Sequence, residues 1–234
     1  MADSTPLISI VIPAYNYGHL LPRAIQSVIV QLDDDSELLV IDDGSTDDTP
    51  QVLATLHARH PGEFRSIRKA NGGASSARNA GITASTGRYL VLLDADDELA
   101  PDALAQIRKH IAAHPDSRFI IGGHVSVGAD GERKTHAPRP LADSGLSRLQ
   151  DYLLEKRISP SNGASVIHRE VFSRGTYPEQ FRNAEDIPVF AQALANFPCS
   201  TLTAPLAIIH KHDDSLRHNL GHALGTGILL VDEI

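Results

Sequence analysis

The sequence has a single cysteine, no tryptophan and no long run of apolar residues. Because Cys199 has no second cysteine to pair with, an intramolecular disulfide is excluded, which fits a reducing compartment. A membrane-spanning helix needs about 18 consecutive apolar residues, and no such run occurs. The first residues, which include Asp3 and Pro6, lack the basic-then-apolar pattern of a secretory signal peptide. These absences predict a cytoplasmic protein without a transmembrane segment.

The chain also lacks an excess of positive charge, because 29 acidic residues against 21 basic ones give a formal net charge of −8. A chain this acidic has no overall field that would attract nucleic acid or anionic lipid. It can still bind a phosphorylated ligand, since a divalent metal held by carboxylates supplies positive charge locally. With 234 residues, 41% of them hydrophobic and 21% charged, the composition is that of a soluble globular protein with a substantial core.

Strand and helix patterns alternate over the first 114 residues. Short apolar, β-branched runs predict buried strands, and longer amphipathic stretches between them predict helices. The predicted strands cover residues 8–12, 38–41, 64–68 and 89–93, and the helices cover residues 19–31, a segment capped near 47–50, 74–85 and 101–114. Strands separated by helices of this size indicate an α/β fold of Rossmann-like type, with a mostly parallel central sheet flanked by helices.

The pattern changes after residue 114. Residues 119–127 and 132–136, joined by a Gly-Ala-Asp-Gly turn, predict a small antiparallel addition to the sheet. A loop at 138–145 is followed by predicted helices at 146–156 and 186–196 and by strands at 163–168 and 201–210. We expect one domain over residues 1–234, with a nucleotide-binding half up to about residue 100 and an acceptor-binding half after it. The chain ends directly after an apolar stretch, which leaves open a C-terminal truncation.

Polar residues follow three of the predicted strands where ligands bind in open α/β sheets, beyond the carboxyl ends of the strands. They are Pro13-Ala14-Tyr15-Asn16, Asp42-Asp43-Gly44-Ser45 and Asp94-Ala95-Asp96-Asp97. Five carboxylates at one edge would repel each other unless a cation or a donor-rich ligand bound there. Oxygen ligands suit Mg²⁺ or Mn²⁺. The sequence lacks both the glycine-rich dinucleotide fingerprint and the phosphate-binding Gly-Lys-Ser/Thr loop, so a metal on Asp-x-Asp is the simplest way to hold phosphates.

Four motifs in this order resemble those of glycosyltransferase family 2, whose members have the GT-A fold. They are Ile10-Val11-Ile12-Pro13-Ala14-Tyr15-Asn16, Val40-Ile41-Asp42-Asp43-Gly44-Ser45-Thr46-Asp47, Asn71-Gly72-Gly73 with Ala77-Arg78-Asn79, and Leu92-Leu93-Asp94-Ala95-Asp96-Asp97. The similarity covers nearly the whole chain and is densest up to about residue 100. It implies a GT-A fold, a nucleoside-diphosphate-sugar donor and an inverting transfer to an acceptor hydroxyl.

The resemblance also implies a nucleotide-sugar site built from all four motifs. Its residues would be Pro13, Ala14, Tyr15, Asn16, Asp43, Asn71, Arg78, Asp94 and Ala95. Asp43 would accept the imide N–H of uracil, which cytosine lacks, so a UDP-sugar is the expected donor. The competing interpretation of Asp42 and Asp43 is a turn that caps the next helix. Arg78 could equally be a surface arginine.

The same resemblance assigns Mn²⁺ or Mg²⁺ to Asp96, with Asp94 on the ribose or the metal. Residues two apart share a direction while a strand stays extended, so both carboxylates would reach the ligand. His212 is a further candidate ligand near the diphosphate, although His210 shares its strand face. An acidic turn and a surface histidine are the alternatives for these residues.

Asp186 matches the catalytic base of the family, within the acidic pair Glu185-Asp186. It would take the proton from the acceptor hydroxyl during attack on the anomeric carbon, in a single displacement that inverts the configuration. An Asp at a helix start could instead cap backbone N–H groups.

Two other functions compete with this one: a haloacid-dehalogenase-like phosphatase that uses Asp94 as nucleophile with Asp96, and a non-catalytic nucleotide-sugar-binding module. For a transferase, the acceptor would be a glycan or a lipid-linked precursor of bacterial-type surface polysaccharide or glycolipid. Such an acceptor would bring the chain to the inner face of the membrane as a peripheral protein.

Overall fold

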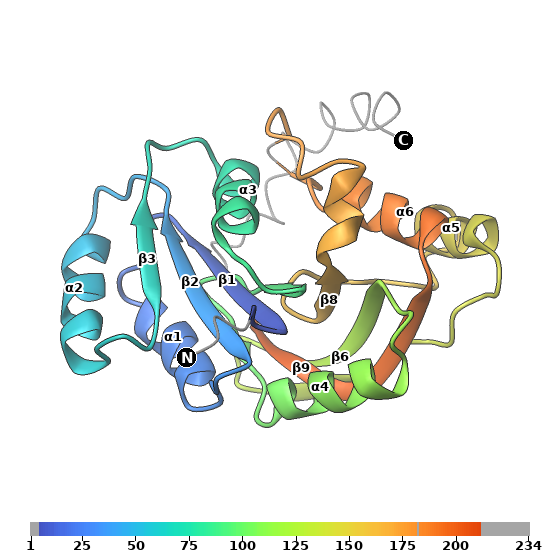
Figure 1. The fold of residues 1–234 in the computed structure, drawn as a ribbon, viewed down its shortest axis with the longest axis horizontal. Coiled ribbons are helices and arrows are strands. Elements are labelled where there is room, and N and C mark those ends of the chain that lie inside the picture. Colours follow the sequence, from blue (N-terminus) through green and yellow to red (C-terminus); the bar gives the residue numbers. More distant parts are fainter. Residues whose placement is uncertain (1–4, 182, 212–234) are drawn as a thin grey trace.

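The computed structural model describes residues 5–181 and 183–211, which form one sheet with helices on both faces (Figure 1). The helices are α1 (Leu21–Ile29), α2 (Thr49–Arg59), α3 (Ala74–Ala84), α4 (Ala103–Ala113), α5 (Gly145–Leu153) and α6 (Ile187–Asn196), with a 3₁₀ turn η1 (Arg169–Ser173). The strands are β1 (Ile8–Ala14), β2 (Ser36–Asp42), β3 (Arg65–Arg68), β4 (Tyr89–Leu92), β5 (Glu98–Leu99), β6 (Phe119–Val127), β7 (Arg133–His136), β8 (Ser165–His168) and β9 (Cys199–His210).

The sheet has a parallel half and a mixed half. Its strand order is β3-β2-β1-β4-β8-β6-β9-β5, and β7 pairs with β6 beside this path. The first four strands of this order run parallel, so their carboxyl ends meet at one edge. Strand β8 is antiparallel to both β4 and β6, whereas β9 is parallel to β6. The predicted α/β fold with an antiparallel addition is therefore confirmed, and β5 and β8 extend the antiparallel part beyond the predicted hairpin β6–β7.

Alternate residues of the central strands supply two hydrophobic cores. In β1, Ile10 and Ile12 pack toward α1, α2 and α4, whereas Val11 packs toward α3 and α6. The same alternation occurs in β2 and β4, as expected for strands buried on both faces. Figure 1 shows α3 and α6 on one side of the sheet and α1 and α4 on the other. This packing fixes α3 and the start of α6 on the same face.

Sequence reasoning missed two short elements. Strand β5 has two residues, which is too short for a periodic signal, and it forms only because Glu98 and Leu99 pair with β9. The 3₁₀ turn η1 directly follows β8, with the side chain of His168 accepting a hydrogen bond from the Glu170 amide. In the described part of the chain, no helix combines the length and the apolar character needed to cross a bilayer.

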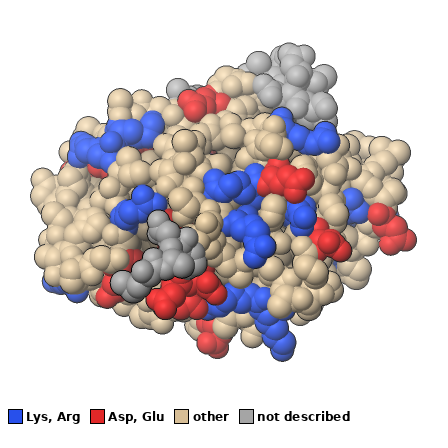
Figure 2. Space-filling model, viewed as in Figure 1, with Lys and Arg blue, Asp and Glu red and all other residues tan. Residues whose placement is uncertain are grey.

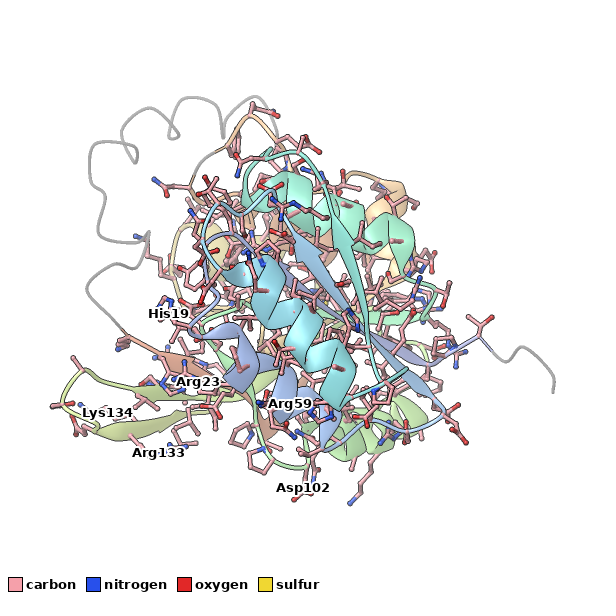
Figure 3. The ribbon with its side chains drawn as sticks, turned by 90° about the vertical axis from the view of Figure 1, so that its left-hand side faces the viewer. His19, Arg23, Arg59, Asp102, Arg133 and Lys134 are labelled. Carbon is pink, nitrogen blue, oxygen red and sulfur yellow. The ribbon has the colours of Figure 1, made fainter. Side chains whose placement is uncertain are left out.

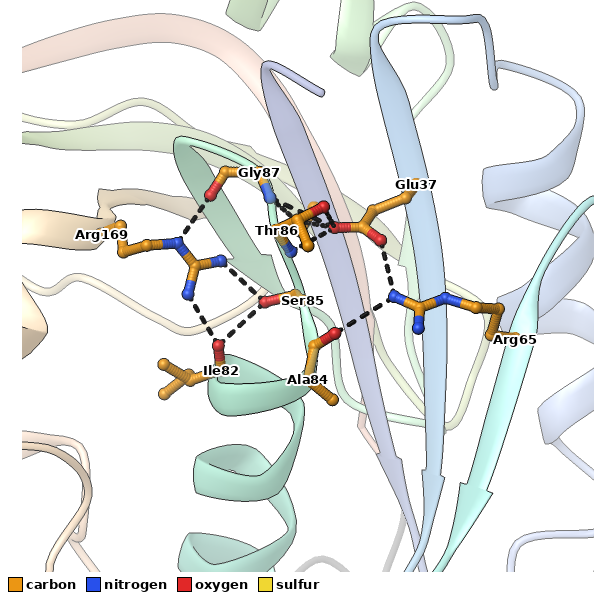
Figure 4. Close-up of polar contacts among 9 residues, drawn as sticks. Glu37, Arg65, Ile82, Ala84, Ser85, Thr86, Gly87 and Arg169 are labelled. Atoms are coloured by element: carbon orange, nitrogen blue, oxygen red, sulfur yellow. Dashed lines mark hydrogen bonds and ion pairs between the residues drawn. The ribbon is translucent and has the colours of Figure 1, made fainter. Parts of the chain in front are cut away.

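A polar cluster anchors the last turn of α3 at the amino end of the sheet (Figure 4). The guanidinium of Arg169 donates to the Ile82 carbonyl (2.7 Å), the Ser85 hydroxyl (2.9 Å) and the Gly87 carbonyl (2.9 Å). Glu37 on β2 accepts from the backbone amide and the hydroxyl of Thr86, which lies between Ser85 and Gly87. Since helix ends leave carbonyls without partners, these bonds stabilise the end of α3 and the approach to β4.

Charged groups are distributed over the visible surface without separating by sign. Figure 2 shows acidic and basic side chains interspersed on the face viewed in Figure 1. Figure 3 shows His19 and Arg23, at the start of α1, on the same side of the molecule as the hairpin β6–β7, from which Arg133 and Lys134 extend.

Candidate active site

The carboxyl ends of β1 and β2 are joined by hydrogen bonds from Asn16. Its side-chain oxygen accepts from the Thr46 amide (2.8 Å) and the Asp47 amide (3.3 Å), and its backbone N–H donates to Ser45 Oγ (3.0 Å). Asn16 adopts a positive φ of 59°, a conformation in which asparagine is enriched. The side chain predicted to bind nucleotide therefore holds two loops of the site together in this structure.

Asp43 is 2% exposed, and its carboxylate is already surrounded by donors. It accepts from Lys69 Nζ (2.7 Å), from the Gly72 amide (3.1 Å) and from the Gly73 amide (2.7 Å). Asn71 donates its side-chain amide to the Asp43 carbonyl (3.0 Å). The Gly72 amide contacts both carboxylate oxygens, so the three donors make four contacts, which fill the roughly four acceptor positions of a carboxylate. A uracil N–H would therefore have to replace one of them. The Lys69 contact is the most exchangeable, because it comes from a flexible side chain.

The expected repulsion among the five carboxylates, which a bound cation or donor-rich ligand was to relieve, is relieved for three of them by cationic side chains of the chain itself. Asp42 pairs with Arg68 (3.3 Å), Asp43 with Lys69 (2.7 Å) and Asp94 with Arg78 (2.8 Å). Asp97 accepts from the His210 amide (2.9 Å). The repulsion argument counted acidic residues along the sequence and had no means to place Arg68 and Arg78 beside them.

The apolar members of the predicted nucleotide site differ in exposure. Ala14 and Ala95 are 3% and 4% exposed, and Pro13 is half-buried. Tyr15 is 44% exposed at the end of β1, so its ring is open to a base or another flat ligand. An exposed aromatic side chain at this edge is the feature that stacking on a nucleobase requires.

The Asp-x-Asp motif lies on a turn and not on an extended strand. Strand β4 ends at Leu92, and the Asp97 amide donates to the Asp94 carbonyl (3.0 Å). The expected alternation of side-chain direction therefore stops before Asp94. The turn is attached to α1, because Arg23 donates to the Asp96 carbonyl.

Arg78 brings the two halves of the chain together. It lies on the face of α3 that packs on the sheet, and its side chain is 6% exposed. Its two terminal nitrogens donate to Asp94 Oδ1 (2.8 Å) and Glu185 Oε1 (2.6 Å). Burial alone would lower the pKa of Arg78. The charges of Asp94 and Glu185 raise it by a larger amount, so the guanidinium stays charged. The surface alternative for Arg78 is therefore excluded.

Asp186 occupies the N-cap position of α6, yet its side chain makes no capping hydrogen bond. Burial is the main cause that raises its pKa to about 6, the nearby negative charge of Glu185 adds to the effect, and Arg78 opposes it. A carboxylate with a pKa near the working pH is suited to accept a proton in catalysis. The capping alternative, which competed with catalysis in the sequence, is not realised.

The described residues could hold a divalent cation at this edge only if a bound ligand supplied part of its coordination. Across residues 5–181 and 183–211, no three His, Cys, Asp or Glu side chains come together as a metal site. Mg²⁺ sites that bind substrate phosphates need only one or two protein carboxylates, which the turn at 94–97 offers. His212 lies outside the described residues, and His210 pairs with Glu98 Oε1 (2.7 Å).

Three contact residues were not predicted from the sequence. Lys69 donates to the Asp43 carboxylate, and the Arg78 guanidinium carbon lies 5.4 Å from the centre of the Tyr177 ring. Asn79 makes two hydrogen bonds to the backbone of Tyr177. Asn79 belongs to the Ala77-Arg78-Asn79 motif, and this place beside Arg78 was the sequence feature that could have identified it. The other two lie in stretches without a periodic or compositional mark.

The acidic turns after β2 and β4 lie at one edge of the sheet, and Arg78 connects the second of them to Glu185, directly before α6. A model of the family described as glycosyl transferase family 2 matches residues 9–176. The chain belongs to this family.

Its relatives include longer proteins. The Pasteurella multocida protein named hyaluronan synthase is 36% identical over 129 residues, covering 55% of this chain and 13% of that protein. The Bacillus subtilis protein described as uncharacterized glycosyltransferase EpsJ is 30% identical over 192 residues, covering 78% of this chain and 54% of that protein. The chain thus spans about half of one relative and a small part of the other.

Solved structures confirm the predicted GT-A fold. S. aureus TarS 1-349, in complex with UDP-GlcNAc, has a TM-score of 0.71 at 21% identity, covering 89% of this chain and 59% of that one. The Pyrobaculum calidifontis mannosyltransferase PcManGT, in complex with GDP-Man and Mn²⁺, has a TM-score of 0.66 at 18% identity, covering 97% and 65%.

Proposed function

We propose that this chain transfers a sugar from a nucleoside-diphosphate sugar to an acceptor hydroxyl, with inversion at the anomeric carbon. The observation that carries the proposal is Asp186, whose side chain makes no capping hydrogen bond to α6 and whose pKa is raised to about 6. It follows Glu185, which Arg78 connects to the Asp-x-Asp turn. Family membership supports the reaction class.

In the proposed mechanism Asp186 is the general base. A carboxylate with a pKa of about 6 is ionised at neutral pH but is far too weak to ionise an alcohol beforehand. Proton transfer therefore occurs late, as the new C–O bond forms and the diphosphate leaves on the opposite side. One displacement of this kind converts an α-linked donor into a β-linked product.

We assign the donor to residues 1–100 and propose a UDP-sugar. Tyr15 would stack on the base, and Asp43 would accept its imide N–H after Lys69 moves away. The UDP-GlcNAc bound to TarS supports this choice, whereas the GDP-Man bound to PcManGT makes guanine the base to compare. Pro13, Ala14, Asn16, Asn71 and Ala95 would complete the pocket wall.

Asp96 would hold Mn²⁺ or Mg²⁺, with Asp94 and His212 as further candidate ligands. The ion would neutralise the diphosphate and stabilise the charge that grows on it as the sugar departs. The Mn²⁺ in PcManGT supports a divalent ion.

The acceptor is proposed to bind residues 101–234. Relatives named hyaluronan synthase and chondroitin synthase support a polysaccharide or its lipid-linked precursor as the acceptor class. We propose that the reaction takes place in the cytoplasm, at the inner face of the membrane when the acceptor is a lipid.

A donor panel tests the function. Purified protein is incubated with UDP-, GDP- and dTDP-sugars, Mn²⁺ and candidate acceptors, and mass spectrometry detects nucleoside diphosphate and glycosylated product. Donor-dependent product supports the transferase. Donor binding without turnover would favour the non-catalytic binding module. Release of phosphate from a phosphomonoester would favour the phosphatase, whose nucleophile Asp94 would first have to break its ion pair with Arg78.

Replacing Asp96 tests the metal assignment. We expect Asp96→Ala to abolish the part of donor binding that depends on Mn²⁺, measured by calorimetry with and without the ion, because a ligand shared with the diphosphate is lost. Asp34→Ala, an exposed acidic residue before β2, is the matched control and should change nothing. Metal-dependent binding that survives in the Asp96 variant contradicts the assignment.

A further inference from the structure

Two consecutive residues of α3, Arg78 and Asn79, contact the same distant segment of the chain. Asn79 donates to the Tyr177 carbonyl (2.8 Å) and accepts from the Tyr177 amide (3.0 Å), as a neighbouring strand would. Arg78 lies over the Tyr177 ring at 5.4 Å and bonds to Glu185. These contacts join α3 to residues about 100 positions later.

The tyrosine is held on its other side as well. The hydroxyl of Tyr177 donates to Asn162 Oδ1 (2.6 Å), and the side chain is 1% exposed. Tyr177 and Glu185 are thus both fixed to α3, and Asp186 follows Glu185 directly. The Asp186 side chain makes no cap hydrogen bond, and its carbonyl accepts from the Phe190 amide, so the contacts of Glu185 and the start of α6 together set its position.

Arg78 has little left to offer a donor molecule. Each terminal nitrogen donates to a carboxylate, and Nε is buried without a hydrogen-bond partner. The side chain is only 6% exposed, so its remaining N–H groups present little accessible surface to a phosphate. A phosphate that displaced Asp94 or Glu185 would also leave an uncompensated charge behind.

We propose that Arg78 and Asn79 are positioning residues, which dock Tyr177 and Glu185 on the donor half and thereby hold Asp186 facing the donor, without contacting the donor themselves. This proposal rests on the proposed function of Asp186. It replaces the nucleotide-binding role expected for Arg78. A shift of about 1 Å at a reacting group can cost about 100-fold in rate, so a tie at this distance is sufficient to control turnover.

Kinetics and donor binding separate the two roles. The variants are Arg78→Lys, Asn79→Ala and Glu185→Gln, each assayed for kcat, for KM and for donor Kd by calorimetry. Lysine cannot pair with two carboxylates in the fork geometry of arginine, so it loosens the tie while keeping the charge. We expect kcat to fall about tenfold to 100-fold in all three, with donor Kd changing less than about threefold.

The exposed pair formed by Arg118 and Glu170 (2.9 Å) is the matched control. Arg118→Lys and Glu170→Gln alter the same chemistry away from the site, and kcat should stay within about twofold of the unmodified chain. A loss of donor affinity of more than about tenfold in Arg78→Lys, without one in Glu185→Gln, would overturn the proposal in favour of direct donor contact.

Hydrogen exchange tests the tie independently of activity. Because the Tyr177 amide donates to Asn79, its exchange should become at least about tenfold faster in Asn79→Ala and in Arg78→Lys. Unchanged exchange in both variants overturns the docking role. If the unmodified chain transfers no sugar but exchange responds as expected, the proposed function fails while the docking stands. Should Asn79→Ala not fold, Arg78→Lys carries the exchange test by itself.

Discussion

Two carboxylates at opposite edges of the sheet have opposite pKa shifts. At the amino edge, Glu37 accepts from Ser9 (2.7 Å), Thr86 (2.6 Å) and Arg65 (2.9 Å). Partial burial alone would raise its pKa, but these bonds bring the pKa below the usual value. At the carboxyl edge, burial and Glu185 raise the pKa of Asp186 to about 6.

The difference separates a structural role from a chemical one. Hydrogen bonds to the charged form favour ionisation and make the folded chain more stable at neutral pH. At Asp186, burial and the charge of Glu185 outweigh the contacts that favour ionisation, so the ionised carboxylate costs stability that other contacts must offset. The amino edge therefore stabilises the sheet, and the carboxyl edge keeps a base ready for proton transfer.

The largest expected effect is on turnover at the carboxyl edge. Asp186→Asn should lower kcat by at least about 100-fold, the low end for loss of a general base, and leave donor affinity unchanged. Because the raised pKa means that ionised Asp186 disfavours the folded state, the melting temperature should not fall. Steady-state kinetics and thermal unfolding measure both quantities. Turnover close to that of the unmodified chain would remove Asp186 from its role.

The mirror experiment at the amino edge should change stability and not chemistry. In Glu37→Gln an amide nitrogen faces a donor of Arg65 or Thr86, so the free energy of unfolding should fall by about 1–3 kcal/mol. Urea denaturation measures this loss, and kcat per folded molecule should be unchanged. A lowered kcat with full stability would erase the distinction between the two edges.

The parallel half of the fold was predictable from sequence because its strands are buried on both faces. Continuous apolar runs ending in polar turns mark β1, β2 and β4, and their order along the chain predicts the edge where the turns meet. By contrast, β5 exists only through pairing with β9, which no local pattern predicts.

The candidate site was predictable where its residues lie in sequence motifs, and not where a residue is paired with one that is distant in the sequence. The acidic turns and Asp186 follow from the sequence, but Arg78 meets a residue 107 positions away. Its two ion pairs, like the Lys69 contact with Asp43, depend on tertiary packing that residue types and spacing do not encode.

The two edges should respond to different pH ranges, with a smaller effect than either substitution. A base must be ionised to work, so kcat/KM should fall as pH drops through about 6, about tenfold between pH 7 and pH 5. The lowered pKa of Glu37 means that its stabilisation is complete above its usual value of 4.5 and is lost below it.

Rate profiles and melting curves over pH 4–8 compare these two quantities. In Asp186→Asn the residual rate should lose the acid limb near pH 6. An acid limb that stays in place in this variant would assign the titration to another group and break the comparison.

The smallest effect is expected from Arg65, although it touches Glu37 directly. Its side chain is 56% exposed, and a solvent-exposed ion pair contributes at most about 1 kcal/mol. In Arg65→Ala, Ser9, Thr86 and Gly87 still donate to Glu37, and water replaces the bond from Arg65 to the Ala84 carbonyl. Urea denaturation should therefore show a loss below that of Glu37→Gln, shrinking further in high salt. An equal loss would mean that the ion pair, and not the set of neutral donors, sets the low pKa at this edge.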